Sequence, residues 1–231
     1  MKSVFHMICE SQRGGRALRL TLLSLALLTP AALAADAVAV KQLAAASTSA
    51  PKLESTAHNV VLQVQDQMRG LMAGGRKKLD KNPQQFIATV GSVLEPVVDF
   101  KYISRAVMGN HARQASAAQR AQFTETFKGG LVATYAKGMV GFADSELAVL
   151  PPREDVGGQR RVSVDQEVRS GDGVTNVSYT MAKNRSGEWK LINVVLKGVN
   201  LGKTFRNQFD QAMKKSGGDI DEVIAGWSED S

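Results

Sequence analysis

The sequence has few of the residues from which catalytic and metal sites are usually built. Its 231 residues include one cysteine, Cys9, and three histidines. A lone cysteine near the N-terminus leaves the rest of the chain without a disulfide, a thiolate nucleophile or a cysteine metal ligand. His58 and His111 are far apart in the sequence, whereas a zinc site needs three or four convergent ligands. We therefore expect no metal and no cofactor.

Common catalytic and phosphate-binding motifs are also missing. The chain has neither a G-x-S-x-G nor an H-E-x-x-H motif. Gly198, Gly202, Lys203 and Thr204 resemble a phosphate loop, but their spacing is one residue shorter than that loop requires. Aromatic residues make up only 6% of the chain and do not alternate with basic ones, which argues against nucleic acid as a partner. The basic cluster at 76–81 is typical of solvated helix ends.

The only long apolar run lies near the N-terminus, and it is short for a membrane anchor, which needs about 20 apolar residues. The run L-T-L-L-S-L-A-L-L at 20–28 follows four basic residues and precedes Ala32-Leu33-Ala34. A basic segment, a short apolar segment and an A-x-A site are typical of a secretory signal peptide. We therefore predict a signal peptide at 1–34, cleaved after about Ala34. Cleavage removes four of the 29 basic and one of the 22 acidic residues, so the formal charge falls from +7 to +4.

Residues 35–50 are rich in Ala, Ser and Thr, so we predict a flexible leader there and a folded domain at 51–231. The first half of that domain is predicted to be helical because apolar residues recur every three or four positions. Helix starts are indicated by Asn82 before Pro83, by Asp99, and by a capping box of Ser116 and Gln119. These signals predict helices over 60–72, 83–94, 99–109 and 116–139.

The period of the apolar residues changes from 3.6 to 2 near Ser145. Apolar residues then alternate with polar ones, and short turns rich in Gly, Ser and Asn separate the runs. The pattern predicts an antiparallel sheet of about four strands, over 147–149, 162–168, 177–181 and 189–196. Helical spacing returns over 201–213 and 220–227. The predicted fold class is therefore α+β, with a helical N-terminal half, an antiparallel sheet and C-terminal helices.

The helices and the sheet all offer large apolar side chains on their inner faces. Periodicity marks a buried face without showing whether a filled core or a hollow lies against it. From the residues alone, three functions remain open. The protein is a carrier with an apolar cavity, an enzyme that acts on an apolar substrate through Asp99 or Tyr179, or an adaptor with a filled core that binds only protein. The pattern favours a plain helix N-cap for Asp99 over a catalytic role.

Several motifs, in order along the chain, resemble the MlaC family, which is also called the toluene-tolerance family. The first group is Asn82-Pro83, P-V-V-D-F at 96–100, Ile103-Ser104 and V-M-G at 107–109. The second group is Gln119-Arg120 followed by Phe123, Phe127, Leu131 and Tyr135. The third is G-E-W at 187–189, V-V-L-K-G-V-N-L at 194–201 and Arg206-x-Gln208-Phe209. The resemblance extends from about Pro51 to Trp227.

This resemblance implies a periplasmic phospholipid carrier that is not an enzyme. Proteins of this family hold acyl chains in an apolar cavity between sheet and helices and keep the headgroup near solvent. The implied partners are a phospholipid, an inner-membrane ABC transporter complex with a lipid-binding ring, and an outer-membrane lipoprotein complex. Shuttling phospholipid between the two membranes would maintain the lipid asymmetry of the outer membrane. We expect the carrier to act as a monomer.

The resemblance and the inward period together predict which residues line the lipid cavity. They are Phe100, Ile103, Val107, Phe123, Phe127, Leu131 and Tyr135 from the helices, Val164, Val177, Tyr179, Met181 and Val194 from the sheet, and Leu201 and Phe205 from the last part of the chain. Arg105 and Arg206 are predicted on the headgroup side.

The chain also departs from the family pattern at a few positions. Asn193, Lys197 and Asn200 stand where the family often has Asp, an acidic residue and Ser, and Ala112 stands where many members have an aromatic residue. We expect the lost acids to alter docking to the partners and to leave the apolar lining unchanged.

Overall fold

The computed structural model of the chain describes residues 56–152, 158–171 and 173–229. The predicted signal peptide and leader lie outside these ranges. Within them, no helix has both the length and the apolar character that crossing a membrane requires. The helices are α2 (Ala57–Met72), α3 (Gly75–Lys81), α4 (Pro83–Leu94), α5 (Phe100–Met108), α6 (His111–Gln114), α7 (Ala117–Met139), the 3-10 turn η2 (Val140–Phe142), α8 (Leu201–Lys215) and α9 (Ile220–Glu229).

The predicted helix starts are confirmed by the capping contacts. The Asn82 side chain accepts a hydrogen bond from the Gln85 N–H at 3.2 Å, and Asp99 accepts one from the Tyr102 N–H at 2.8 Å. Ser116 and Gln119 form both hydrogen bonds of a capping box. Such caps satisfy backbone donors that have no partner inside the helix. The short helices α3 and α6 were not predicted, because four to seven residues give too little periodicity to detect.

The strands form one antiparallel sheet whose spatial order follows the chain. They are β1 (Glu146–Val149), β2 (Arg161–Ser170), β3 (Gly173–Lys183), β4 (Trp189–Leu196) and β5 (Val199–Asn200), in the order β1-β2-β3-β4-β5. The prediction of about four strands missed β5, which has only two residues. Each strand pairs with its neighbour in sequence, and Val177 of β3 lies opposite Leu196 of β4. The α+β fold class is confirmed.

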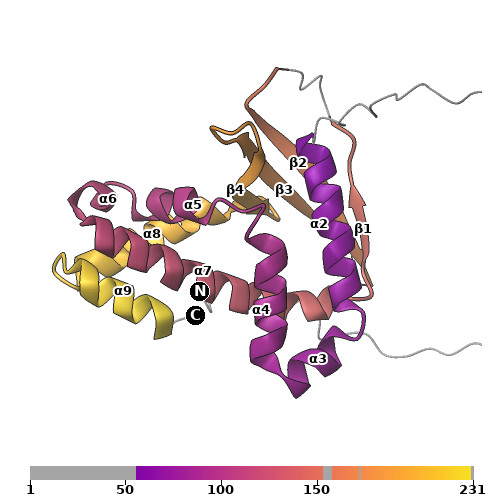
Figure 1. Ribbon diagram of the computed structural model, residues 1–231, viewed down its shortest axis with the longest axis horizontal. Coiled ribbons are helices and arrows are strands. Elements are labelled where there is room, and N and C mark those ends of the chain that lie inside the picture. The colour runs from indigo at the N-terminus through magenta and orange to yellow at the C-terminus, as the bar shows by residue number, and fades with distance from the viewer. Residues whose placement is uncertain (1–55, 153–157, 172, 230–231) are drawn as a thin grey trace, which may run out of the picture. The chain divides into compact units, whose positions relative to one another are not determined.

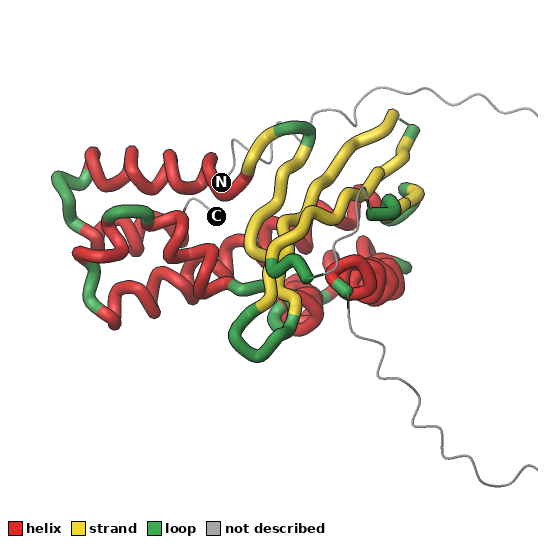
Figure 2. Tube along the Cα trace, turned by 90° about the horizontal axis from the view of Figure 1, so that it is seen from above, coloured by secondary structure: helices red, strands yellow, loops and turns green. Residues whose placement is uncertain are grey.

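The helices divide into two groups around the sheet. Helices α5, α6, α8 and α9 lie on the left of Figure 1, α7 runs from there across the centre past α4, and α2 stands beside the strands on the right. Figure 2 shows the strands as one layer, with α8 leaving the sheet directly after β5. Because α2 contacts both β1 and β2, it covers that part of the sheet.

Three buried apolar clusters hold these parts together. The helical cluster joins α5, α7, α8 and α9 and contains Phe123, Phe127, Phe209 and Trp227. A second cluster joins α2, α4 and α7 around Met68, Phe86 and Val90. The third packs the start of α2 against the sheet through Ala57, Val162, Val164, Met181 and Trp189. Between these clusters the inner face of the sheet is left partly uncovered.

Candidate functional site

A cavity of about 580 Å³ lies between the inner face of the sheet and the helices. Its wall is built from α2, the end of α4, α5, α7, η2, the four long strands and the start of α8. Most of the wall residues are Val, Leu, Ile, Met or Phe. On β2 the residues Gln166, Val168 and Ser170 line the cavity, as expected for alternate residues of one strand face. The size and lining are those of a pocket for an apolar ligand.

Eleven of the fourteen residues predicted to line the cavity are part of its wall. They are Phe100, Ile103, Phe127, Leu131, Tyr135, Val177, Tyr179, Met181, Val194, Leu201 and Phe205. Whether they bind a lipid stays a prediction. The other three are elsewhere. Val107 and Phe123 are buried in the helical cluster, and Val164 packs in the cluster between α2 and the sheet.

One physical reason explains why these three predicted residues lie outside the cavity wall. Each lies on the buried face of its element, and periodicity identified that face correctly. The cavity, however, touches only part of the length of each element. Val107 lies one turn beyond Ile103 on α5, and Phe123 one turn before Phe127 on α7, where other helices cover them.

Helix α2 is the part of the wall that the prediction missed. It contributes Val60, Val61, Val64, Met68 and Met72 to the lining. All of them except Val61 belong to the apolar stripe from which the helix was predicted, so the signal was present in the sequence. The stripe alone could not show that it faces a cavity, because the strands on the other side of the cavity are far from α2 in the sequence.

The two residues predicted on the headgroup side lie outside the cavity wall, and whether they meet a headgroup stays a prediction. Arg105 and Arg206 are both exposed and neither lines the cavity. Arg206 lies instead against Gly109, whose φ of 56° suits glycine. A Cβ at Gly109 would be 2.8 Å from Nε of Arg206. The basic residues that line the cavity are Arg69 of α2 and Lys197, which follows β4.

A chain of polar side chains crosses the otherwise apolar wall. Gln166 is 5% exposed, and its Nε2 donates a hydrogen bond to Oε1 of Gln65 on α2 at 2.6 Å. The hydroxyl of Tyr179 donates to Oε1 of Gln166, also at 2.6 Å. The chain satisfies buried polar groups that would otherwise cost about 1–3 kcal/mol each. It also ties α2 to the middle of the sheet.

Two tyrosines of the wall differ in their hydrogen bonding. Burial, with a contribution from the neighbouring Tyr135, raises the pKa of the Tyr179 hydroxyl well above its usual range. Burial raises the pKa of Tyr135 to about 12. Tyr135 is 38% exposed, but it lines the cavity, and within the described residues its hydroxyl has no hydrogen-bond partner. Both groups therefore stay neutral at physiological pH.

The opening of the cavity lies at one end of the sheet. Its exposed wall residues include Val174 beside the β2–β3 turn, Lys197 in the β4–β5 turn and Ala143 just before β1. Val177 opposite Leu196, and Glu146 opposite Arg169, place those three segments at the same end of the sheet. Val174 is 57% exposed, so an apolar side chain stands at the rim.

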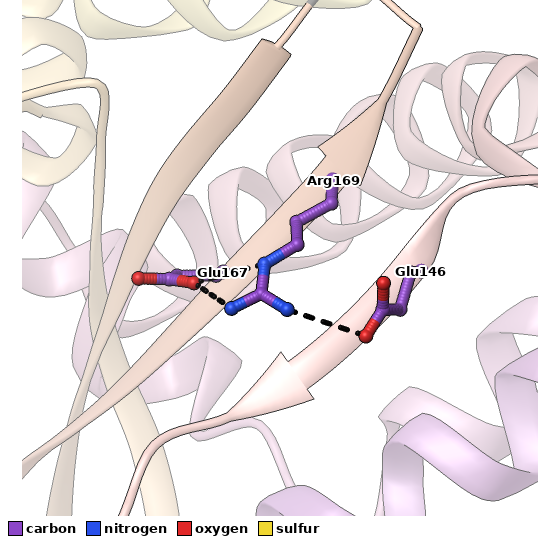
Figure 3. A network of polar contacts seen from close by, with 3 residues as sticks. All are labelled: Glu146, Glu167 and Arg169. Atoms are coloured by element: carbon purple, nitrogen blue, oxygen red, sulfur yellow. Dashed lines mark hydrogen bonds and ion pairs between the residues drawn. The ribbon is translucent and has the colours of Figure 1, made fainter.

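The opposite face of the sheet is charged rather than apolar. Arg169 forms ion pairs with Glu167 at 2.7 Å and with Glu146 at 3.3 Å (Figure 3). Glu167 and Arg169 alternate along β2 with the wall residues Gln166 and Val168, so their side chains point away from the cavity. The carboxylates of these two glutamates are therefore paired on the outer face.

The groups suggested for an enzyme are engaged in structural contacts. Asp99 caps α5 and does not line the cavity, and Tyr179 is hydrogen-bonded to Gln166. The described part of the chain brings together no group of three or more His, Cys, Asp or Glu residues that could hold a metal ion. The fold and the cavity thus define a protein that can enclose an apolar ligand, and the described wall residues include no Asp, Glu or His that could pair as acid and base.

Comparison with known proteins identifies the family. The chain belongs to the MlaC family, whose profile matches residues 62–229. It is 35% identical over 175 residues to toluene tolerance protein Ttg2D of Pseudomonas putida, covering 75% of this chain and 80% of that protein. It is 23% identical over 151 residues to the intermembrane phospholipid transport system binding protein MlaC of Haemophilus influenzae, covering 64% of this chain and 70% of that protein.

A solved structure is similar in fold as well. It is a phospholipid-binding protein from Ralstonia solanacearum in complex with a phospholipid, with a TM-score of 0.68 and 25% identity. The similarity covers 75% of this chain and 95% of that one. The resemblance noted from sequence motifs is therefore confirmed at the level of family and fold.

Proposed function

We propose that the protein is a phospholipid carrier that holds acyl chains in the cavity between sheet and helices. The observation that carries this proposal is the cavity itself, with about 580 Å³ of apolar space that is open at one end of the sheet. The solved relative from Ralstonia solanacearum, which is a phospholipid-binding protein in complex with a phospholipid, supports the choice of ligand. A filled core, as the adaptor hypothesis requires, is incompatible with this space.

The physical chemistry of the wall suits acyl chains. Each CH₂ group removed from water contributes about 0.8 kcal/mol, so one or two acyl chains give strong retention without specific polar contacts. Retention of that size makes spontaneous release into water slow. Transfer therefore requires a docked partner that offers another apolar surface.

The route of transport extends the proposal. The carrier works in the periplasm after export and moves phospholipid between the outer and inner membranes, which maintains outer-membrane lipid asymmetry. The relative from Haemophilus influenzae is named as the binding protein of an intermembrane phospholipid transport system, and the signal-like N-terminal sequence supports export. Its partners are an inner-membrane ABC transporter complex with a lipid-binding ring and an outer-membrane lipoprotein complex. It acts without catalysis.

The test is native mass spectrometry of the protein, produced from the full chain in a bacterial host and purified without detergent, followed by lipid extraction. We expect a mass excess that resolves into intact phospholipids. A bare protein mass, together with no uptake from phospholipid vesicles, would contradict the proposal. Production of a lysophospholipid or fatty acid during incubation would instead favour an enzyme.

A pair of variants ties the ligand to the cavity. Leu131 and Val132 are neighbours on α7, but Leu131 lines the cavity whereas Val132 is buried in the cluster with α2 and α4. Leu131→Gln should reduce bound lipid because a polar group in the wall must lose its water when the ligand binds. Val132→Ala should lower the free energy of unfolding by about 1 to 2 kcal/mol and leave lipid binding intact. Equal lipid content in both folded variants would count against the cavity as the binding site.

A further inference from the structure

The charged residues of the cavity wall are all of one sign. Among the described residues that line it, Arg69 and Lys197 are the charged ones, and no carboxylate is present. Neither cation forms an ion pair or a side-chain hydrogen bond within the described ranges. A cation that has no protein partner can form an ion pair with a negatively charged group of a ligand.

Both cations lie at the open end of the cavity. Lys197 is in the turn between β4 and β5, at the same end of the sheet as the β2–β3 turn. Helix α2 starts against the far end of the sheet, where Ala57 packs with Val162, and passes its middle at Gln65. Arg69, one turn after Gln65, is therefore displaced toward the opening.

The backbone at Lys197 is in a conformation that lysine rarely adopts. Its φ is 49°, and it is the sole non-glycine residue with positive φ in the described part of the chain. Gly198 follows with a φ of 78°, and Leu196 pairs with Val199. Two consecutive positive φ values are those of a two-residue type I′ turn, for which Asn-Gly is the preferred sequence. A strained residue that makes no local side-chain contact is typical of a functional position.

None of the described carboxylates lines the cavity beside these two cations. Glu146 and Glu167 lie on the outer face of the sheet, where Arg169 pairs with both (Figure 3). Asp144, an exposed carboxylate between the wall residues Ala143 and Ser145, stands near the rim but does not line the cavity, whereas Arg69 and Lys197 do.

We propose that Arg69 and Lys197 select phospholipids whose headgroup carries net negative charge, such as phosphatidylglycerol, over zwitterionic ones such as phosphatidylethanolamine. This inference rests on the proposed lipid-carrier function and adds a headgroup preference to it. The acyl chains occupy the apolar wall and place the phosphate at the rim, within reach of the two cations. The ammonium of a zwitterionic headgroup is repelled by the same charges.

The size of the preference follows from the exposure of the site. Both cations are exposed, so each contributes about as much as an exposed ion pair, which is a factor of two to five in the binding ratio. The Debye length shortens from about 30 Å at 0.01 M salt to about 3 Å at 1 M salt. The preference must therefore decrease as salt is added, whereas acyl-chain burial persists.

The experiment is a competition between two lipids for the protein produced from the full chain. The protein exchanges lipid in mixed micelles that hold equal amounts of phosphatidylglycerol and phosphatidylethanolamine, and the bound lipids are extracted and quantified by mass spectrometry. We expect about a threefold or greater enrichment of phosphatidylglycerol at low salt. Arg69→Gln and Lys197→Asn should each reduce it, and the double variant should bind the two lipids in the ratio of the micelles.

The control is Lys101→Gln, which removes an exposed helical cation outside the cavity wall. It should keep the wild-type enrichment, whereas an enrichment lost equally in this variant would point to net charge alone and overturn the proposal. Wild-type protein that binds both lipids in the micelle ratio would also overturn it. Absence of any bound phospholipid would instead refute the carrier function, so the two failures are distinguishable.

Discussion

The helical cluster and the cavity are both lined by apolar side chains, yet one is filled and the other is hollow. In the helical cluster, aromatic rings from α7, α8 and α9 contact each other, with ring centroids 4.9 Å apart for Phe123 and Phe209 and 5.4 Å apart for Phe123 and Trp227. Around the cavity, side chains from α2, α7 and the sheet face one another across about 580 Å³ of space. The distance between the elements decides whether the space between them is filled. The apolar character of their side chains does not decide it.

Helix α7 is the boundary between the two regions. Both Phe123 and Phe127 are fully buried, but Phe127 lines the cavity and packs on Phe205 at a ring distance of 5.5 Å, whereas Phe123, one turn earlier, does not line it. The comparison therefore predicts that substitutions of similar chemistry have different consequences on its two sides.

The largest difference is expected for removal of a side chain. Phe209→Ala creates a new void in the helical cluster and should lower the free energy of unfolding by about 3–5 kcal/mol. Val194→Ala enlarges a space that already exists, so its cost should stay near 1 kcal/mol. Urea unfolding of both variants measures these values. Similar losses in the two proteins would mean that the cavity wall is packed as tightly as the helical cluster.

Enlarging a side chain should reduce lipid binding more at the cavity wall than in the helical cluster. Val194→Trp occupies part of the cavity and should exclude lipid while the fold remains stable. Val107→Trp overfills the helical cluster and should cost about 1–3 kcal/mol, with lipid binding retained in the folded fraction. Lipid content by mass spectrometry and urea unfolding separate the two effects. Normal loading of the Val194 variant would contradict the position of the ligand.

The polar chain in the wall provides a smaller test. Tyr179→Phe leaves Oε1 of the buried Gln166 without its donor and should lower the free energy of unfolding by about 1–2 kcal/mol. Tyr135→Phe removes a hydroxyl that has no partner in the described structure, so it should be nearly neutral. If the two variants unfold at the same urea concentration, the hydrogen bond to Gln166 contributes no net stability.

Alkaline pH should affect the cavity wall before it affects the helical cluster. The pKa of Tyr135 is about 12 in the folded protein and about 10 in an unfolded chain. A pKa that is raised on folding gives stability that is complete below pH 10 and is lost as the pH rises through about 12. Tyr135→Phe should therefore weaken the loss of stability over this interval. An unchanged pH profile in the variant would show that Tyr135 ionises as freely in the folded protein.

The smallest effect is expected at the rim, and it is stabilising. Lys197→Asn places a residue that tolerates positive φ in the turn, so the free energy of unfolding should rise by about 0.5–1 kcal/mol. Thermal unfolding followed by circular dichroism is sensitive enough to detect this. A fall in the melting temperature would show that the lysine side chain stabilises the turn, which would remove the argument from strain.

Much of the fold could be predicted because its signals are local. The Ser116–Gln119 capping box, Pro83 after Asn82 and the change of period near Ser145 each act over a few residues. The helices and long strands followed from them. The two-residue strand β5 and the short helices α3 and α6 carry too few residues for a period to be recognised.

The cavity was less predictable because it depends on distances between elements. Periodicity placed Phe123 and Phe127 on the same face of α7, and only the positions of α8 and α9 decide that one is enclosed and the other lines the cavity. The cations at the rim were missed for a similar reason. Their place depends on the course of α2 and on the β4–β5 turn, which no local pattern reveals.

The order of the strands has a consequence for how the protein folds. Because every strand pairs with its neighbour in sequence, each pairing closes only a short loop, and no crossover has to form first. Such local contacts are associated with rapid folding. The sheet can therefore assemble as a series of hairpins soon after the chain emerges, whereas α2 must be brought back over more than 70 residues to meet β1. Packing α2 on the sheet thus closes a longer loop than any of the strand pairings does.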